Sequence, residues 1–178
     1  AGYLWPPRPS VEGYPAAAAT EHYAAAGIHL HAFDVGVGHE WCGPGEGRAS
    51  DYDFDTVEQR FGHIIEADPE ARFHLRLQLE LSPRELWWHN RHPQEREVDS
   101  GGNPTTQSHA SPVWRQQAND FLTQFAQHLK DIGMAERVFA YQTGAGHTGE
   151  WVKGLTSMRT PCGDYSAPMA QHFRLWLE

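Results

Sequence analysis

The stretch RFHLRLQLEL at residues 72–81 carries the signal that decides the fold. Apolar and polar side chains alternate along it without a break, which is the period of a β-strand. One face carries Phe73, Leu75, Leu77 and Leu79, and the other carries His74, Arg76, Gln78 and Glu80. A parallel sheet with helices on both sides should be apolar on both faces, so the polar face favours a barrel strand whose inner face reaches the lumen. An antiparallel sheet with one face in water is the alternative.

Helices and strands are predicted to alternate on both sides of this stretch. Further strands are expected at residues 2–5, 28–36 and 137–143, and helices at 16–26, 53–67, 111–132 and 167–177, with a short one at 84–90. Strands separated by helices imply parallel pairing through right-handed crossovers. The loops after the strands (36–53, 82–110 and 144–165) are long, and the loops after the helices are short. In (β/α)8 barrels the loops after the strands build the active site.

The length limits how much of a barrel the chain can form. A barrel of eight units needs roughly 250 residues, whereas this chain has 178. We therefore predict an α/β fold in one domain, residues 1–178, which is the first half (about four βα units) of a TIM (β/α)8 barrel. The C-terminal half of the barrel is then absent from the chain. A small open α/β sheet is the alternative.

Composition and charge exclude several classes of partner. The net charge of −9 argues against nucleic acid or an anionic membrane surface as the main partner. The sequence contains no apolar run long enough to span a membrane and no visible signal peptide, which slightly favours the cytoplasm, although the chain does not begin with Met. With only two cysteines, Cys42 and Cys162, the chain is not a disulfide-dense scaffold. The sequence does not decide between one disulfide bridge and two free thiols.

Tryptophan and histidine are unusually frequent, with 7 Trp and 12 His residues. Flat aromatic faces suit sugar rings as well as protein partners. We expect a sugar platform of Trp41, Trp88 and Trp151, with polar contacts from Arg76, Glu80, Gln142 and His147. The alternative for each tryptophan is packing in the core.

The sequence His29-Leu30-His31 places two imidazoles on one face of a strand. At the end of a barrel strand such a pair is a metal-ligand arrangement, since neutral imidazole nitrogens bind zinc well. This is the basis of an alternative function, a metal-dependent hydrolase of the amidohydrolase type. Further ligands could come from Asp34, His74 or His147, but no second metal motif follows, so we predict no metal. Polar lumen residues bonded to their neighbours are the simpler interpretation.

The sequence QTGAGHTGEW at residues 142–151 places a carboxylate just beyond a strand, in a glycine-rich loop. Glycines let the backbone come close to a ligand. An adjacent indole at a barrel mouth can raise the pKa of a carboxyl group by desolvation, as a general acid requires. Glu150 is therefore the candidate catalytic residue.

The chain from residue 24 to 178 resembles the N-terminal half of a (β/α)8 retaining glycoside hydrolase, most like family 42 β-galactosidases and their uncharacterised relatives. Three groups of residues carry the resemblance: Ala26-Gly27-Ile28 with Trp41 and Tyr52-Asp53-Phe54; residues 73–80 with Trp87-Trp88 and His92-Pro93; and Asp164-Tyr165-Ser166 with residues 173–177. The resemblance implies a retaining, two-carboxylate mechanism on a carbohydrate substrate without a cofactor. It also places the acid/base glutamate after the fourth strand, where Glu150 falls.

Two departures from the family pattern matter for function. Gly149 stands where the family has an asparagine that holds a sugar hydroxyl, so another group must do this or the substrate differs. The family nucleophile follows the seventh strand and is not in this chain. Glu80 and Glu40 are the nearest substitutes, but neither lies where the family places its nucleophile.

The missing nucleophile has a consequence for the chain by itself. We expect it to hydrolyse no glycoside alone and to associate with itself or with a complementary C-terminal half, because half a barrel leaves sheet edges unpaired. A non-catalytic half-barrel that binds sugars is the remaining alternative.

Overall fold

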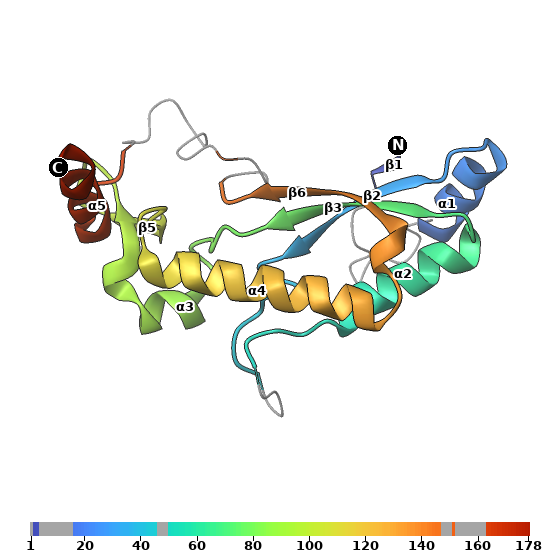
Figure 1. The fold of residues 1–178 in the computed structure, drawn as a ribbon, viewed down its shortest axis with the longest axis horizontal. Coiled ribbons are helices and arrows are strands. Elements are labelled where there is room, and N and C mark those ends of the chain that lie inside the picture. The colour runs from blue at the N-terminus through green and yellow to red at the C-terminus, as the bar shows by residue number, and fades with distance from the viewer. Residues whose placement is uncertain (1, 4–15, 46–49, 147–150, 152–162) are drawn as a thin grey trace.

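The computed structural model describes residues 2–3, 16–45, 50–146, 151 and 163–178 and has a mixed α/β architecture (Figure 1). One parallel sheet has the order β1 (Gly2–Tyr3), β2 (Leu30–Gly36), β3 (Arg72–Gln78) and β6 (Val138–Gly144). The helices that separate or follow these strands are α1 (Ala16–Ala25), α2 (Asp55–Ala67), α4 (Pro112–Asp131) and α5 (Ala167–Leu177). The predicted α/β class and the parallel pairing are confirmed. That this sheet is half of a barrel stays a prediction.

The loop after β3 contains secondary structure that the sequence patterns did not predict. Besides the expected short helix, α3 (Leu86–Arg91), it holds the 3₁₀ turn η1 (Pro93–Glu95) and a hairpin of β4 (Arg96–Val98) and β5 (Pro104–Gln107). A second 3₁₀ turn, η2 (Ala135–Arg137), precedes β6. The hairpin strands are three and four residues long and mostly polar, so they give no strand periodicity to recognise.

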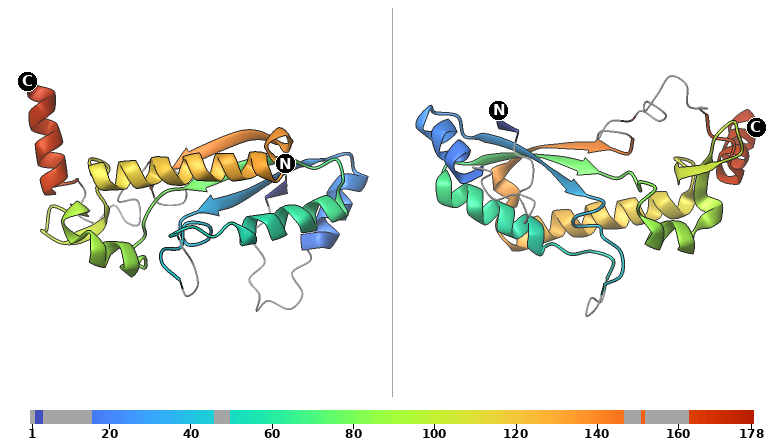
Figure 2. Two further views of the ribbon diagram at one scale, coloured as in Figure 1. Left: turned by 60° about the horizontal axis from the view of Figure 1, so that its bottom comes forward. Right: turned by 180° about the vertical axis from the view of Figure 1, so that it is seen from behind.

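The core lies between the sheet and helices α2 and α4, which cover the same face (Figures 1 and 2). Phe33 and Phe73 point from β2 and β3 toward α2, where the Phe61 ring meets both edge-on at 5.5 and 4.7 Å. Helix α2 forms here because Val57, Phe61 and Ile64 recur at helical spacing and are all buried. Each such buried side chain stabilises the fold by roughly 1.5–3 kcal/mol.

Helix α4 has a complete set of start signals. Ser111 is its N-cap and accepts a hydrogen bond from the Trp114 backbone N–H at 3.0 Å, and Pro112 occupies the first turn. Its buried stripe then runs through Trp114, Ala118, Phe121, Phe125 and Leu129. The first turns of the helix lie near the carboxyl end of β3, because Trp114 Nε1 donates to the Leu79 carbonyl oxygen at 3.0 Å.

The opposite face of the sheet is polar and half-buried, as the alternation at residues 72–81 predicts. The register places Asp34, Arg76 and Gln142 side by side on β2, β3 and β6. A register shift between Phe73 and His74 marks a bulge in this pairing, and the Phe139 ring lies 6.0 Å from the His74 ring. Bulges commonly re-aim a side chain in this way.

Apolar side chains remain exposed on the last strand and the last helix. Tyr141 lies on β6, at the edge of the sheet, and is 48% exposed. On α5 the exposed large apolar residues are Phe173, Leu175, Trp176 and Leu177. Helix α5 stands beside α3 and β5 at one end of the molecule, away from the core under the sheet (Figure 2). Within the described residues, no helix is long and apolar enough to cross a membrane.

Candidate functional site

Two of the predicted polar residues, Arg76 and Gln142, lie side by side toward the carboxyl ends of β3 and β6. Arg76 Nη1 lies 3.6 Å from Asp34 Oδ1, and both side chains are largely but not fully buried. Gln142 is the next residue in this row, and Glu80 is half-buried just beyond β3. These groups can accept or donate hydrogen bonds at a polar surface on the face opposite the core.

A tight turn after β2 is organised around a buried ion pair that the sequence analysis did not find. Glu40 Oε1 accepts from Arg60 Nη2 at 2.6 Å, and Oε2 accepts from the Gly36 backbone N–H at 2.8 Å. Gly36 has φ of 120°, and a Cβ there would lie 2.2 Å from the Gln78 carbonyl oxygen, so only glycine fits.

Burial raises the pKa of the Glu40 carboxyl, although Arg60 and the Gly36 N–H oppose this shift. Burial likewise lowers the pKa of the Arg60 guanidinium, with Glu40 and Asp34 opposing. Because both carboxylate oxygens are engaged, Glu40 is a structural residue, and its suggested role as a substitute nucleophile is wrong.

Two of the three expected platform tryptophans belong to the core. Trp41 is 1% exposed and its ring stacks on Phe121 with centroids 5.6 Å apart. Trp88 is 0% exposed, and its Nε1 donates to Gln117 Oε1 at 2.6 Å. The predicted sugar platform is therefore wrong for Trp41 and Trp88, because both rings are buried against α4, Trp41 on Phe121 and Trp88 on Gln117.

Trp151, in contrast, is 55% exposed and keeps an accessible ring beside the His109 imidazole. The two remaining predicted residues of this segment, His147 and the catalytic candidate Glu150, lie outside the described residues. They stay predictions.

The different environments of the tryptophans lead to a test by substitution. Trp88→Phe should lower the free energy of unfolding by about 1–3 kcal/mol, through a lost hydrogen bond and lost volume. Trp151→Phe should change it by less than about 0.5 kcal/mol, as is usual for surface positions. Urea unfolding followed by circular dichroism measures both, and equal effects would contradict the assignment.

The loops after β3 and β6 meet at side chains that the sequence analysis did not single out. Gln107, at the end of β5, donates from Nε2 to the Ala145 carbonyl oxygen at 3.3 Å and accepts from the Leu81 backbone N–H at 2.8 Å. His109 Nε2 donates to the same carbonyl at 2.9 Å. The only sequence signal was their place in a long loop after a strand.

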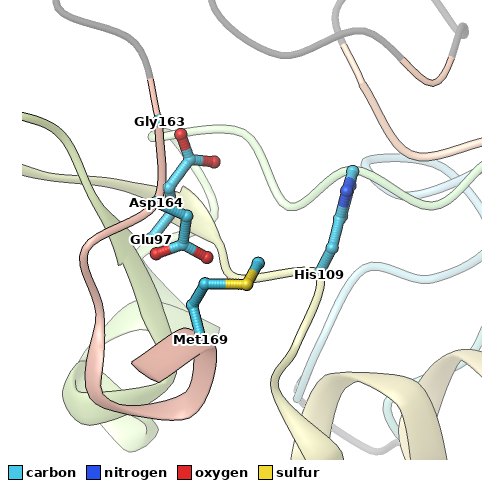
Figure 3. A pocket seen from close by; sticks show the side chains of 5 residues that line it. All are labelled: Glu97, His109, Gly163, Asp164 and Met169. Atoms are coloured by element: carbon cyan, nitrogen blue, oxygen red, sulfur yellow. The ribbon is translucent and has the colours of Figure 1, made fainter. Parts of the chain in front are cut away.

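A pocket of about 150 Å³ lies beside His109. Figure 3 shows the carboxylates of Glu97 and Asp164 on one side, the His109 ring across from them and the Met169 thioether between. Asp164 accepts from the Ser108 hydroxyl at 2.5 Å and from the Ser166 backbone N–H at 3.0 Å. It therefore joins the hairpin region to the start of α5.

The two histidines of the possible metal motif lie at the opposite end of the sheet. His29 Nδ1 and His31 Nε2 lie 2.8 and 2.9 Å from the two carboxylate oxygens of Asp68, which caps the carboxyl end of α2. The pair therefore precedes or opens β2, away from the loops that follow the strands. Among the described residues, no group of three or more His, Cys, Asp or Glu side chains is arranged to hold a metal ion. The expected hydrogen bonding to neighbours is therefore present, but the expected place in a lumen is wrong for His31, which is 1% exposed and pairs with Phe73 on the face of the sheet that meets the core.

The Asp68 cluster gives stability that depends on pH. Burial acts to raise the pKa of Asp68, but hydrogen bonds from His31, His29 and the Glu70 backbone N–H bring it below its ordinary value. A lowered carboxyl pKa stabilises the fold above the unfolded-state pKa, and this contribution is lost as the pH falls through the folded-state pKa.

Asp68→Asn should therefore lower the free energy of unfolding near neutral pH by about 1–3 kcal/mol, because it removes charge-assisted hydrogen bonds. The difference in free energy of unfolding between the variant and wild type should shrink below about pH 4, where the Asp68 carboxylate becomes protonated. Denaturant unfolding between pH 2.5 and 7 measures this, and a constant difference across that range would refute the role of the carboxylate.

Comparisons with known proteins give a fold likeness only. No protein-family model matches the chain, and no curated protein matches it by sequence. Among solved structures, the β-galactosidase from the psychrophilic Marinomonas ef1 is similar to it, with a TM-score of 0.61 and 16% sequence identity. The match covers 98% of this chain and 24% of that chain. The chain thus spans about a quarter of the β-galactosidase it resembles, and the likeness concerns the fold.

Proposed function

We propose that this chain is the N-terminal half of a (β/α)8 retaining glycoside hydrolase of β-galactosidase type, with Glu150 as its acid/base. The observation that carries the proposal is the fold likeness to a β-galactosidase over nearly the whole chain. The placement of polar residues supports it, since Asp34, Arg76 and Gln142 share one row of the sheet face opposite the core. The exposed Trp151 adds a ring suited to a sugar face near the carboxyl end of β6.

In this mechanism Glu150 first acts as an acid and then as a base. It protonates the glycosidic oxygen while a second carboxylate attacks the anomeric carbon, forming a covalent glycosyl-enzyme and releasing the aglycone. Glu150 then removes a proton from the water that hydrolyses this intermediate, so the anomeric configuration is retained. The second carboxylate would come from the other half of the barrel. Arg76, Glu80 and Gln142 are the candidates to hold sugar hydroxyls, since Gly149 replaces the family's asparagine.

Two features of the described residues support a complementary half. Strand β6 is at the edge of the sheet and carries the exposed Tyr141, and α5 exposes four large apolar side chains. A closed barrel would pair β6 with a further strand and cover the apolar side chains of α5, because closure removes sheet edges. Three sources could complete the barrel: a C-terminal half from the same polypeptide, one from a partner chain, or a second copy of this chain that approximates it.

Hydrolysis of a panel of 4-nitrophenyl glycosides tests the proposal, with the full-length protein that contains these residues and the 178-residue chain assayed side by side. The full-length protein should release 4-nitrophenol from at least one sugar, with a first-formed product of unchanged anomeric configuration by proton NMR. The isolated chain should be inactive. Glycan binding by the full-length protein without turnover of any glycoside would instead indicate a non-catalytic sugar-binding protein.

A further inference from the structure

Asp34 and Arg76 form an ion pair between neighbouring strands on the polar face of the sheet. The register aligns Asp34 of β2 with Arg76 of β3, and Arg76 Nη1 lies 3.6 Å from Asp34 Oδ1. The two side chains are 14% and 22% exposed, so each keeps a small accessible surface. Gln142 of β6 is aligned with Arg76 on its other side and is half-buried. A molecule bound against this row therefore meets both charges together.

Asp34 is fixed in position by Arg60 of α2. Arg60 Nη1 donates to the Asp34 backbone carbonyl oxygen at 2.5 Å, and Arg60 Nη2 donates to Glu40 Oε1 at 2.6 Å. The Arg60 guanidinium also lies over the ring of Phe33, a core residue, 5.2 Å from its centroid. The charge of Arg60 is thus balanced by Glu40 inside the protein, whereas the Asp34 carboxylate is paired with Arg76.

The charges of the polar face nearly cancel toward the carboxyl ends of the strands. Within the described part of the face there, Arg76 carries the positive charge, and Asp34 and Glu80 carry negative charges. His39, in the turn after β2, adds no charge near neutral pH, because burial and Arg60 lower its pKa despite the opposing effect of Asp34. An unpaired guanidinium at the position of Arg76 would instead be a strong site for a carboxylate, sulfate or phosphate.

From this arrangement we propose that Asp34 is a specificity-determining residue, which neutralises Arg76 and so restricts the site to uncharged sugars. The inference rests on the proposed function, and it adds the class of sugar and the residue that selects it. A sugar hydroxyl can accept from the guanidinium and donate to the carboxylate at the same time. A carboxylate or sulfate on the sugar would be brought next to Asp34 as well as Arg76, and losing its water there without a net opposite charge is unfavourable.

The test compares variants of the full-length protein on three 4-nitrophenyl glycosides that share one sugar, the one that the panel shows to be hydrolysed fastest. The first substrate is unmodified, the second carries a carboxylate in place of the C6 hydroxymethyl group, and the third carries a sulfate on O3. The measured quantity is the ratio of kcat/KM for each anionic substrate to kcat/KM for the unmodified one. Both values come from the same protein preparation, so partial unfolding of a variant lowers them in proportion and leaves the ratio unaltered.

Wild type should prefer the unmodified glycoside by at least about 10-fold. Asp34→Asn should raise the ratio for at least one anionic substrate by about 10- to 100-fold, the size of one hydrogen bond to a charged group. Asp131→Asn, which removes an exposed carboxylate at the end of α4, is the matched control and should leave both ratios unchanged. Arg76→Gln should lower kcat/KM for the unmodified glycoside by about 10-fold and raise neither ratio.

Any of four results would overturn the inference while leaving the glycosidase assignment intact. They are a wild type equally active on the anionic substrates, ratios unchanged by Asp34→Asn, an equal rise in Asp131→Asn, and an Arg76→Gln variant as active as wild type on the unmodified glycoside.

Failure of the proposed function is distinguishable from failure of this inference. If the wild-type protein hydrolyses no glycoside of the panel, the proposed function falls, and calorimetric titration of the same proteins with galactose and galacturonate measures the selection without turnover. Wild type should bind galactose more tightly, and Asp34→Asn should shift the preference toward galacturonate. Absence of that shift would overturn the inference as well.

Discussion

Replacing Glu150 with Gln in the full-length protein should lower kcat for phenyl glycosides by about 10²- to 10⁴-fold, the usual contribution of general acid–base catalysis. Glutamine keeps the shape of the side chain but cannot donate or remove the proton. For a 2,4-dinitrophenyl glycoside the first step no longer needs protonation, so formation of the glycosyl-enzyme should be far less affected. Hydrolysis of that intermediate still needs a base, so a burst of dinitrophenol followed by a slow steady state is expected.

A matched control separates the role of Glu150 from a general effect of removing a carboxylate. Glu66 is exposed on α2, and Glu66→Gln should leave both substrates unaffected. Stopped-flow absorbance at the dinitrophenolate band measures the burst, and steady-state assays measure the phenyl glycoside. If Glu150→Gln keeps turnover of the phenyl glycoside within about threefold of wild type, far less than general acid catalysis contributes, Glu150 is not the acid.

The second large effect concerns stability at the turn after β2. Glu40→Gln should lower the free energy of unfolding by about 3–5 kcal/mol, because it leaves the buried Arg60 guanidinium without its counter-charge. Burial lowers the pKa of Arg60 even with Glu40 and Asp34 beside it, so the variant leaves only Asp34 to oppose that shift. Glutamine can still accept from the Gly36 N–H, so the loss reports mainly on the ion pair.

Two comparisons sharpen this experiment. Replacing both partners, as Glu40→Leu with Arg60→Met, should cost less than Glu40→Gln alone, since no buried charge is then left unpaired. Glu58→Gln removes a half-exposed carboxylate 3.0 Å from His128 and should cost less than about 1 kcal/mol. Urea unfolding near pH 7 measures all three, and a Glu40→Gln effect no larger than that of Glu58→Gln would contradict the role of the buried pair.

The parts of the fold that follow from local periodicity could be predicted from the sequence. The alternation at residues 72–81 predicts β3 and its polar face, and the spacing of Val57, Phe61 and Ile64 predicts α2. Ser111 followed by Pro112 marks the start of α4 correctly. Each of these signals lies within a few residues, where backbone geometry alone relates the side chains.

The parts that depend on contacts between distant residues could not be predicted in this way. An indole suits a sugar face or a core equally well, and only the position of α4 decides that Trp41 and Trp88 are buried. His31 and Asp68 are 37 residues apart in sequence, and their pairing converts a possible metal motif into a hydrogen-bonded cluster. The Gln107 and His109 contacts likewise depend on how the loop after β3 returns to β6.

The central claim, that Glu150 is the acid/base of a retaining glycosidase, is tested most directly by azide rescue of a Glu150→Ala variant of the full-length protein. Azide needs no base, so it can enter the space left by the carboxylate and attack the anomeric carbon of the glycosyl-enzyme. With a 2,4-dinitrophenyl glycoside as substrate, turnover should rise with azide concentration, and the product should be a glycosyl azide of the substrate's anomeric configuration by NMR. Turnover unchanged by azide with no glycosyl azide formed, or an azide product of inverted configuration, would contradict the account.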